Sequence, residues 1–245
     1  MQSLQHARLK AARALEHLEA YRCELEKYYD SKPYAVTRTN DADRGQHVIR
    51  IFLKDPGDKM AILAGEFAHA LRSSLDHTVY SLIIFATNAI PDSRAVQWPV
   101  QERQDDKQFE RQTRGMHTDA ANIIKSLQPY HEGPGEAFRN SQIWQLHMLD
   151  IIDKHRRIAF HENALDCHFP GLKESDGISF EPDVDGWGEV TLPLHLSKTE
   201  MLLNPKPRIT FGDVPERLTL DVEMLSELYT LVTAKILPQF DGFFV

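Results

Sequence analysis

Residues 65–80 have the sequence GEFAHALRSSLDHTVY, in which apolar and polar residues alternate with helical spacing. Wound as a helix at about 100° per residue, this stretch gathers its apolar side chains on one arc. These core-facing residues are Phe67, Leu71, Leu75 and Thr78, continued by Leu82. The polar side chains gather within about 140° on the other side, and they are Glu66, His69, Arg72, Ser73, Asp76, His77 and Tyr80. The pattern predicts an amphipathic helix, which we expect to run from about residue 58 to residue 88.

Further helices are predicted on both sides of this stretch. The first 30 residues carry an apolar series spaced mostly by three to five, namely Leu4, Leu9, Ala11, Leu15, Leu18, Leu25 and Tyr29. Pro33 ends that helix, because proline cannot continue the hydrogen-bond ladder. Similar periodicity predicts helices at about 104–113, 117–127, 141–161 and 221–240.

Strands are predicted in two places. Residues 34–53 contain two β-prone runs around the turn-forming segment Asn40–Gly45, which indicates a hairpin. Runs beginning at Ile178, Glu189 and Arg208 have strand character, with glycine and proline between them.

The predicted fold class is therefore α+β and mostly α. We expect a helical bundle with an N-terminal β-hairpin and a small antiparallel sheet near the C-terminus. The chain is predicted to be a single domain, 1–245. Its helical core would comprise about 1–30, 58–161 and 221–240, and its β-rich segments about 34–53 and 175–220.

Composition limits the function classes. The 245 residues carry a formal net charge of −8, which disfavours a role in coating nucleic acid but permits a local basic cleft. Two cysteines, Cys23 and Cys167, cannot build a disulfide framework, so we expect a reducing, cytoplasmic location. The apolar run Val79–Ile90 is shorter than the roughly 20 residues of a membrane span, so no membrane association is expected.

The polar face of residues 66–80 is a candidate site. It contains no lysine, although lysine and glutamate dominate ordinary solvated helix faces. It places two histidines, an arginine, two carboxylates, a serine and a tyrosine side by side, and these groups can transfer protons or hold anions. The competing interpretation is a plain solvated helix face.

A second polar stripe lies in the predicted helix 141–161. Its members recur every three or four residues, and they are His147, Asp150, Lys154, Arg157 and His161. His155 and Arg156 fall in or beside the apolar arc, where a polar group needs a partner. We expect the two stripes to share one cleft, with Arg156 paired to Asp76 or Glu66.

The motifs EFAHALRSSLDHTVY, QWPV, LQPY and LDIIDKHR resemble those of an uncharacterised family of bacterial proteins across about residues 34–161. That resemblance implies no particular activity.

A looser resemblance implies chemistry. Arg72-Ser-Ser-Leu-Asp-His77 is similar to the Arg-polar-x-x-x-His signature of HEPN-type helical domains, with Ser73 at a position that is often Asn. Many such domains are metal-independent ribonucleases of toxin–antitoxin and phage-defence systems. The resemblance implies RNA as substrate, an antitoxin or defence partner, a homodimer and no cofactor. Arg72 and His77 would be catalytic, and the predicted supporting residues are Glu66, His69, Ser73, Asp76, Tyr80, Asp153, Lys154, His155 and Arg156.

Two other interpretations stay open. Glu66 and His69 form a Glu-x-x-His, the spacing used by di-iron carboxylate bundles, and the Asp150–His155 region could add ligands. No second Glu-x-x-His is present. The stripes could instead form a salt-bridge network or a ligand pocket in a non-catalytic interaction module.

Overall fold

The computed structural model describes residues 3–54, 57–91 and 96–155, the strand segments between 159 and 210 together with residue 195, and residues 219–244. The chain divides into two compact units. Unit 1 comprises Met1–Tyr21, Ile62–Arg156 and Val222–Val245, and unit 2 comprises Arg22–Ala61 and Arg157–Asp221. The fold is α+β and mostly α, as predicted. Whether the two units unfold together as the predicted single domain stays a prediction.

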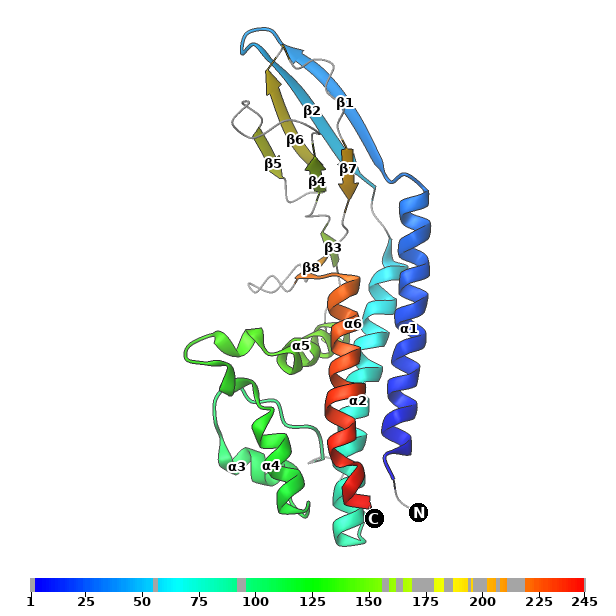
Figure 1. The fold of residues 1–245 in the computed structure, drawn as a ribbon, viewed down its shortest axis with the longest axis vertical. Helices are drawn as coiled ribbons and strands as arrows, with labels where there is room; N and C mark the ends of the chain where they lie inside the picture. Colours follow the sequence, from blue (N-terminus) through cyan, green and yellow to red (C-terminus); the bar gives the residue numbers. More distant parts are fainter. Residues whose placement is uncertain are drawn as a thin grey trace. The chain divides into compact units, whose positions relative to one another are not determined.

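Unit 1 is helical (Figure 1). Its elements are the first part of α1 (Gln5–Asp30), most of α2 (Asp58–Thr87), α3 (Asp106–Thr113), α4 (Thr118–Ser126), η1 (Pro129–Glu132), η2 (Ala137–Asn140), α5 (Gln142–His155), α6 (Val222–Thr230), η5 (Leu231–Ile236) and η6 (Leu237–Phe244). The predicted helices therefore exist, although the last one changes after Thr230 to a wider π-helical segment and then to 3₁₀-helical turns. None of the described helices combines the length and the apolar character that a membrane crossing requires.

The core of unit 1 follows the periodicity of α2. Phe67, Leu71 and Leu75 are fully buried, as their spacing predicts. The buried face of α1 differs from the prediction, because Leu9 is 58% exposed. The side chains buried on that helix recur alternately at three and four residues, and they are Leu4, Ala7, Ala11, Ala14, Leu18 and Tyr21. The three alanines at the centre of this series let a neighbouring backbone approach closely.

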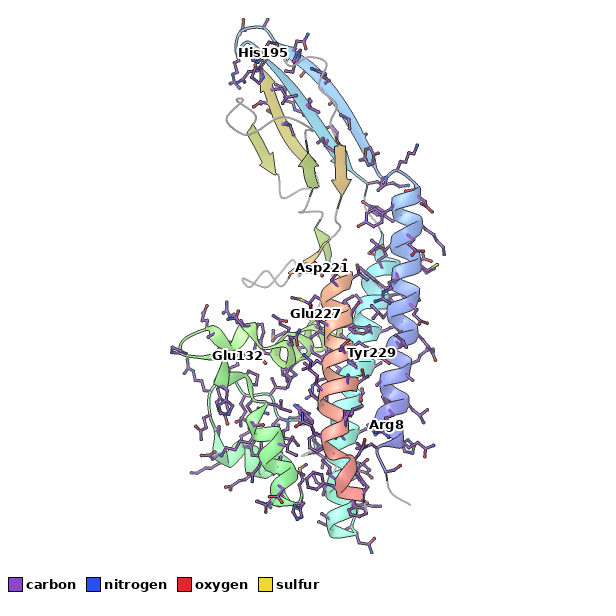
Figure 2. The ribbon with its side chains drawn as sticks, in the orientation of Figure 1. Arg8, Glu132, His195, Asp221, Glu227 and Tyr229 are labelled. Carbon is purple, nitrogen blue, oxygen red and sulfur yellow. The ribbon has the colours of Figure 1, made fainter. Side chains whose placement is uncertain are left out.

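Helix α6 and the turns after it run beside α2 (Figure 1). Phe240 packs edge-on against the buried Trp98 at 6.0 Å between ring centroids. Arg8 of α1, labelled in Figure 2, is bound to Asp241 at 2.6 Å. These contacts connect the beginning and the end of the chain within unit 1.

Unit 2 contains the strands. The predicted hairpin is present as β1 (Tyr34–Asp41) and β2 (Gln46–Leu53). The other strands are β3 (Ala159–His161), β4 (Leu165–His168), β5 (Ser179–Pro182), β6 (Trp187–Pro193), β7 (Leu202–Pro205), β8 (Arg208–Thr210) and β9 (Thr219–Leu220).

The hairpin is not a separate element, which corrects the sequence prediction. β2 pairs antiparallel with β6, so the hairpin is part of a four-stranded sheet in the order β1-β2-β6-β5. Ile49 lies opposite Val190 in this register, and both are buried. Smaller sheets join β3 to β8 and β9, and β4 to β7.

A second correction concerns the helix predicted at 141–161. α5 ends at His155, and Ala159–His161 is a strand paired with Arg208–Thr210. His161 therefore does not continue the polar stripe of α5. Arg156 and Arg157 lie outside the described residues, as does the side chain of His155.

Candidate functional site

Helix α2 supplies the centre of the candidate site. α1 runs antiparallel to it, since His17 lies opposite Glu66 and His6 lies opposite His77. α5 is also antiparallel to α2, because Asp153 lies against Gly65 and Asp150 is bonded to His69. The polar face of α2 thus meets different partners along its length.

The two predicted stripes meet at His69 and Asp150. Nδ1 of His69 is 2.8 Å from Oδ1 of Asp150, and Lys154 Nζ donates to Oδ2 of the same carboxylate at 2.6 Å. The Asp150 side chain is only 6% exposed, whereas that of His69 is 51% exposed. A buried carboxylate held from both sides fixes the imidazole orientation and favours the proton on Nδ1.

One turn earlier, α2 approaches α5 closely. A Cβ at Gly65 would overlap the carboxylate of Asp153, so only glycine leaves room for this side chain. Burial is the main reason why the pKa of Asp153 is raised, and the charges of Asp150 and Glu66 add to it, while His69 opposes it. Glu66 itself points to α1, where its Oε2 is 3.1 Å from Nδ1 of the buried His17.

Arg72 has a structural environment. It is 4% exposed, and it forms an ion pair with Asp76. Its Nη2 donates to the carbonyl of Trp98 at 2.7 Å, and the amide of Trp98 donates to Oδ1 of Asp76 at 2.7 Å. Arg72 and Asp76 together therefore satisfy both backbone groups of a fully buried residue and fix the segment around Trp98 to α2. We call this arrangement the Trp98 clamp.

His147 of α5 lies near the clamp. Burial is the main cause of a pKa lowered from 6.5 to about 4, followed by the positive charge of Arg72. Its Nδ1 is buried and has no hydrogen-bond partner among the described residues. His147 is therefore a neutral imidazole at physiological pH.

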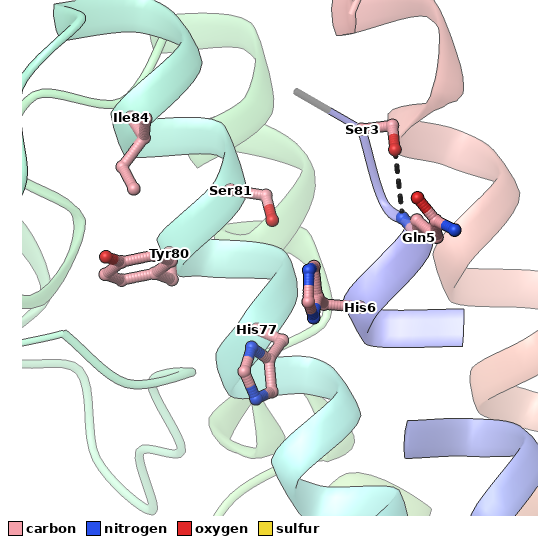
Figure 3. Close-up of a pocket in the computed structure, with 7 residues that line it drawn as sticks. All are labelled: Ser3, Gln5, His6, His77, Tyr80, Ser81 and Ile84. Carbon is pink, nitrogen blue, oxygen red and sulfur yellow. Dashed lines mark hydrogen bonds between the residues drawn. The ribbon is translucent and has the colours of Figure 1, made fainter. Parts of the chain in front are cut away.

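His77 lies in a different environment, shown in Figure 3. Its ring faces that of His6, with centroids 6.2 Å apart and planes inclined by 22°. Both histidines line a pocket of about 350 Å³, together with Ser3, Gln5, Tyr80, Ser81 and Ile84. Burial lowers the pKa of His77 below its usual 6.5, and the charges of Lys10 and His6 lower it further, against a weaker opposing effect of Asp76.

The predicted site residues thus form separate groups. The structure brings Glu66, His69, Asp153 and Lys154 together at the crossing of α2 and α5, while Arg72 and Asp76 form the Trp98 clamp. His77 and Tyr80 line the pocket. Ser73 is half-buried, and its hydroxyl forms no hydrogen bond with the other described residues. The expected Arg156 partner of Asp76 or Glu66 lies outside the described residues.

Sequence reasoning missed the contribution of α1. His6, Lys10 and His17 are spaced by four and seven residues, which places them on one face of that helix. Histidines at helical spacing opposite a second histidine-bearing helix are the signal that could have identified them.

No group of three or more His, Cys, Asp or Glu side chains in the described part of the chain is arranged to hold a metal ion. Glu66 and His69 instead turn to different partners, His17 and Asp150. No protein-family model, curated protein or solved structure matches the chain. The geometry of the site is therefore the basis for proposing a function.

Proposed function

We propose that the pocket of His6 and His77 is the catalytic site of a metal-independent ribonuclease. The observation that supports this most directly is the pair of imidazoles, 6.2 Å apart, facing one another at an open pocket of about 350 Å³. The hydrogen bonds of an imidazole lie in the plane of its ring, so a phosphoryl group in the pocket would contact the edges of the two rings and not the space between their faces.

The two histidines would divide the proton transfers of RNA cleavage. His77 takes the proton of the 2′-hydroxyl, whose oxygen then attacks the adjacent phosphorus. The bond from phosphorus to the 5′-oxygen breaks, and His6 gives that leaving oxygen a proton. The products are a 2′,3′-cyclic phosphate and a free 5′-hydroxyl. The lowered pKa of His77 suits it to the role of base, because the ring is neutral near pH 7.

Lys10 is the cation best placed to hold the phosphate. It lies one helical turn after His6, and its charge acts on His77. Arg72 has the role of phosphate ligand in the HEPN resemblance, but its guanidinium is bound to Trp98 and Asp76. The proposed site therefore uses His77 and the chemistry predicted from the sequence, with Lys10 in the phosphate-binding role in place of Arg72.

The test is cleavage of single-stranded RNA by the full chain in the presence of EDTA, with the 2′,3′-cyclic phosphate detected by mass spectrometry. His77→Gln and His6→Gln should each lower the rate by about 10²–10⁴-fold. His131→Gln is the matched control, since His131 is exposed and bonded to the carbonyl of Lys125, and it should cleave normally. Circular dichroism verifies that each variant is folded.

The pH profile provides a second readout. With His77 as the base, the rate should rise with pH through a midpoint below 6.5, because the base must lose its proton to act. Unchanged cleavage in folded His77→Gln would exclude the proposal. An intact chain that cleaves no RNA would favour the non-catalytic interaction module. The antitoxin or defence partner and the homodimer stay predictions, and sedimentation measures the latter.

A further inference from the structure

A second cavity lies in unit 1 at the C-terminal end of α2, separate from the His6–His77 pocket. Its volume is about 380 Å³, within the range of small-molecule sites. The lining residues come from the end of α2, from the segment after it, and from the end of α3 with the turn that follows.

The wall of this cavity is largely apolar. Ile83, Ile90 and Val96 contribute branched side chains, and Ile90 is 84% exposed. At the edge of a cavity, this exposed side chain adds apolar surface that a ligand could cover.

The turn after α3 closes one side of the cavity because it contains a glycine. Gly115 has φ +88°, and a Cβ there would lie 2.8 Å from Cγ2 of Thr87. Both the backbone conformation and the close approach to α2 exclude a larger residue. This wall of the cavity therefore requires glycine at position 115.

The charged residues that line the cavity are basic in the described part of the chain. They are Arg111 and Arg114, and none of the described lining residues is Asp or Glu. Both arginines are exposed, and within the described part of the chain neither is paired with a carboxylate. In contrast, Arg8 and Arg13 of α1 each have an acidic partner. Two guanidinium groups beside an apolar wall are complementary to an anion attached to an apolar group.

We propose that this cavity binds a small amphipathic monocarboxylate. The carboxylate is held by Arg111 and Arg114, and its apolar part lies against Ile83, Ile90 and Val96. An acyl chain and the C-terminal residue of a peptide share this chemistry, and the experiment distinguishes them. This inference does not depend on the proposed ribonuclease activity, since the two cavities have no lining residue in common.

Calorimetric titration of the full chain with octanoate and with N-acetyl-leucine tests the proposal. We expect a dissociation constant on the order of millimolar or tighter for at least one of them. Octanoate binding alone indicates an acyl chain, and N-acetyl-leucine binding alone indicates a peptide terminus. Octylamine should not bind, because it carries the opposite charge.

Variants assign the binding to this cavity. Arg111→Gln and Arg114→Gln should each weaken binding about tenfold, through the loss of one charge-assisted hydrogen bond. Arg103→Gln is the matched control, an exposed arginine outside the cavity, and it should bind normally. Ala89→Trp should abolish binding by filling the cavity from an exposed position, with little effect on folding. Failure of both carboxylates to bind, equal binding of octylamine, or normal binding by Ala89→Trp would each overturn the proposal.

Discussion

Arg72→Ala tests whether the Trp98 clamp is structural. The substitution removes the ion pair to Asp76 and the donor to the carbonyl of Trp98, a residue that is fully buried. A buried acceptor left without its donor costs about 1–3 kcal/mol. The ion pair adds less than a fully buried one, because the Asp76 side chain is 38% exposed. Together with the lost packing of the aliphatic part of the arginine side chain, we expect the free energy of unfolding to fall by about 2–4 kcal/mol.

Urea denaturation of the parent and the variant measures this loss. Arg13→Ala is the matched control, because it removes an ion pair with Glu16 in which both side chains are 61% exposed. It should change the free energy of unfolding by less than about 0.5 kcal/mol. For a chain of this length, a loss of about 2–4 kcal/mol lowers the melting temperature by about 4–16 °C. Arg72→Lys should also be destabilising, because one ammonium cannot reproduce the two-sided contact of the guanidinium.

Two outcomes would refute this reasoning. A free energy of unfolding for Arg72→Ala within about 0.5 kcal/mol of the parent would show that the clamp contributes little. Loss of RNA cleavage in an Arg72 variant of undiminished stability would return Arg72 to the catalytic role that the HEPN resemblance implies.

Two further predictions concern the contact of α5 with α2. The pKa of His147 falls from 6.5 to about 4 on folding, so its contribution to stability is present above pH 6.5 and is lost as pH falls toward 4. At pH 5 the loss is about 2 kcal/mol, and His147→Leu should remove this part of the acid sensitivity in urea titrations at pH 5 and 7. Gly65→Ala should destabilise the chain by about 1–2 kcal/mol, since overpacking against Asp153 exceeds the gain in helix propensity. Adding Asp153→Ala to Gly65→Ala should restore stability, because it removes the carboxylate that the new Cβ would meet. Gly242→Ala is the control and should be neutral, because a Cβ there meets open space. A Gly65→Ala variant more stable than the parent would contradict the close approach of α2 and α5.

The core face of α2 could be predicted from the sequence because its signal is local. Phe67, Leu71 and Leu75 are large, apolar and one helical turn apart, and each is fully buried. In α1 the same reasoning selected Leu9, which is exposed, and passed over Ala7 and Ala14, which are fully buried. A row of alanines gives only a weak hydrophobic pattern in the sequence. It stabilises the fold by letting a neighbouring helix approach closely, and the apolar area of each side chain contributes little.

The end of α5 shows a second reason why part of the fold could not be predicted from the sequence. The periodicity of the sequence continues past His155, but the chain changes to a strand at Ala159. That strand pairs with Arg208–Thr210, about fifty residues further along. Pairing over such a separation replaces local helix propensity with interactions that no short window of sequence contains. For the same reason the sequence did not predict that β2 would pair with β6.

The candidate site also could not be predicted from one stretch of sequence, because its residues come from segments that lie far apart in the chain. Arg72 and His77 are five residues apart on one continuous helix, and five steps of about 100° place their side chains about 140° apart. Two side chains this far apart around a helix contact different neighbours. Arg72 contacts the segment around Trp98, whereas His77 contacts α1. The motif therefore cannot bring its own arginine and histidine to one small pocket within this helix. A second proton-transfer group must come from another element, and His6 is the group that α1 provides opposite His77. The proposed chemistry at this site therefore depends on the packing of α1 on α2, and His6→Gln and His77→Gln test it from the two helices.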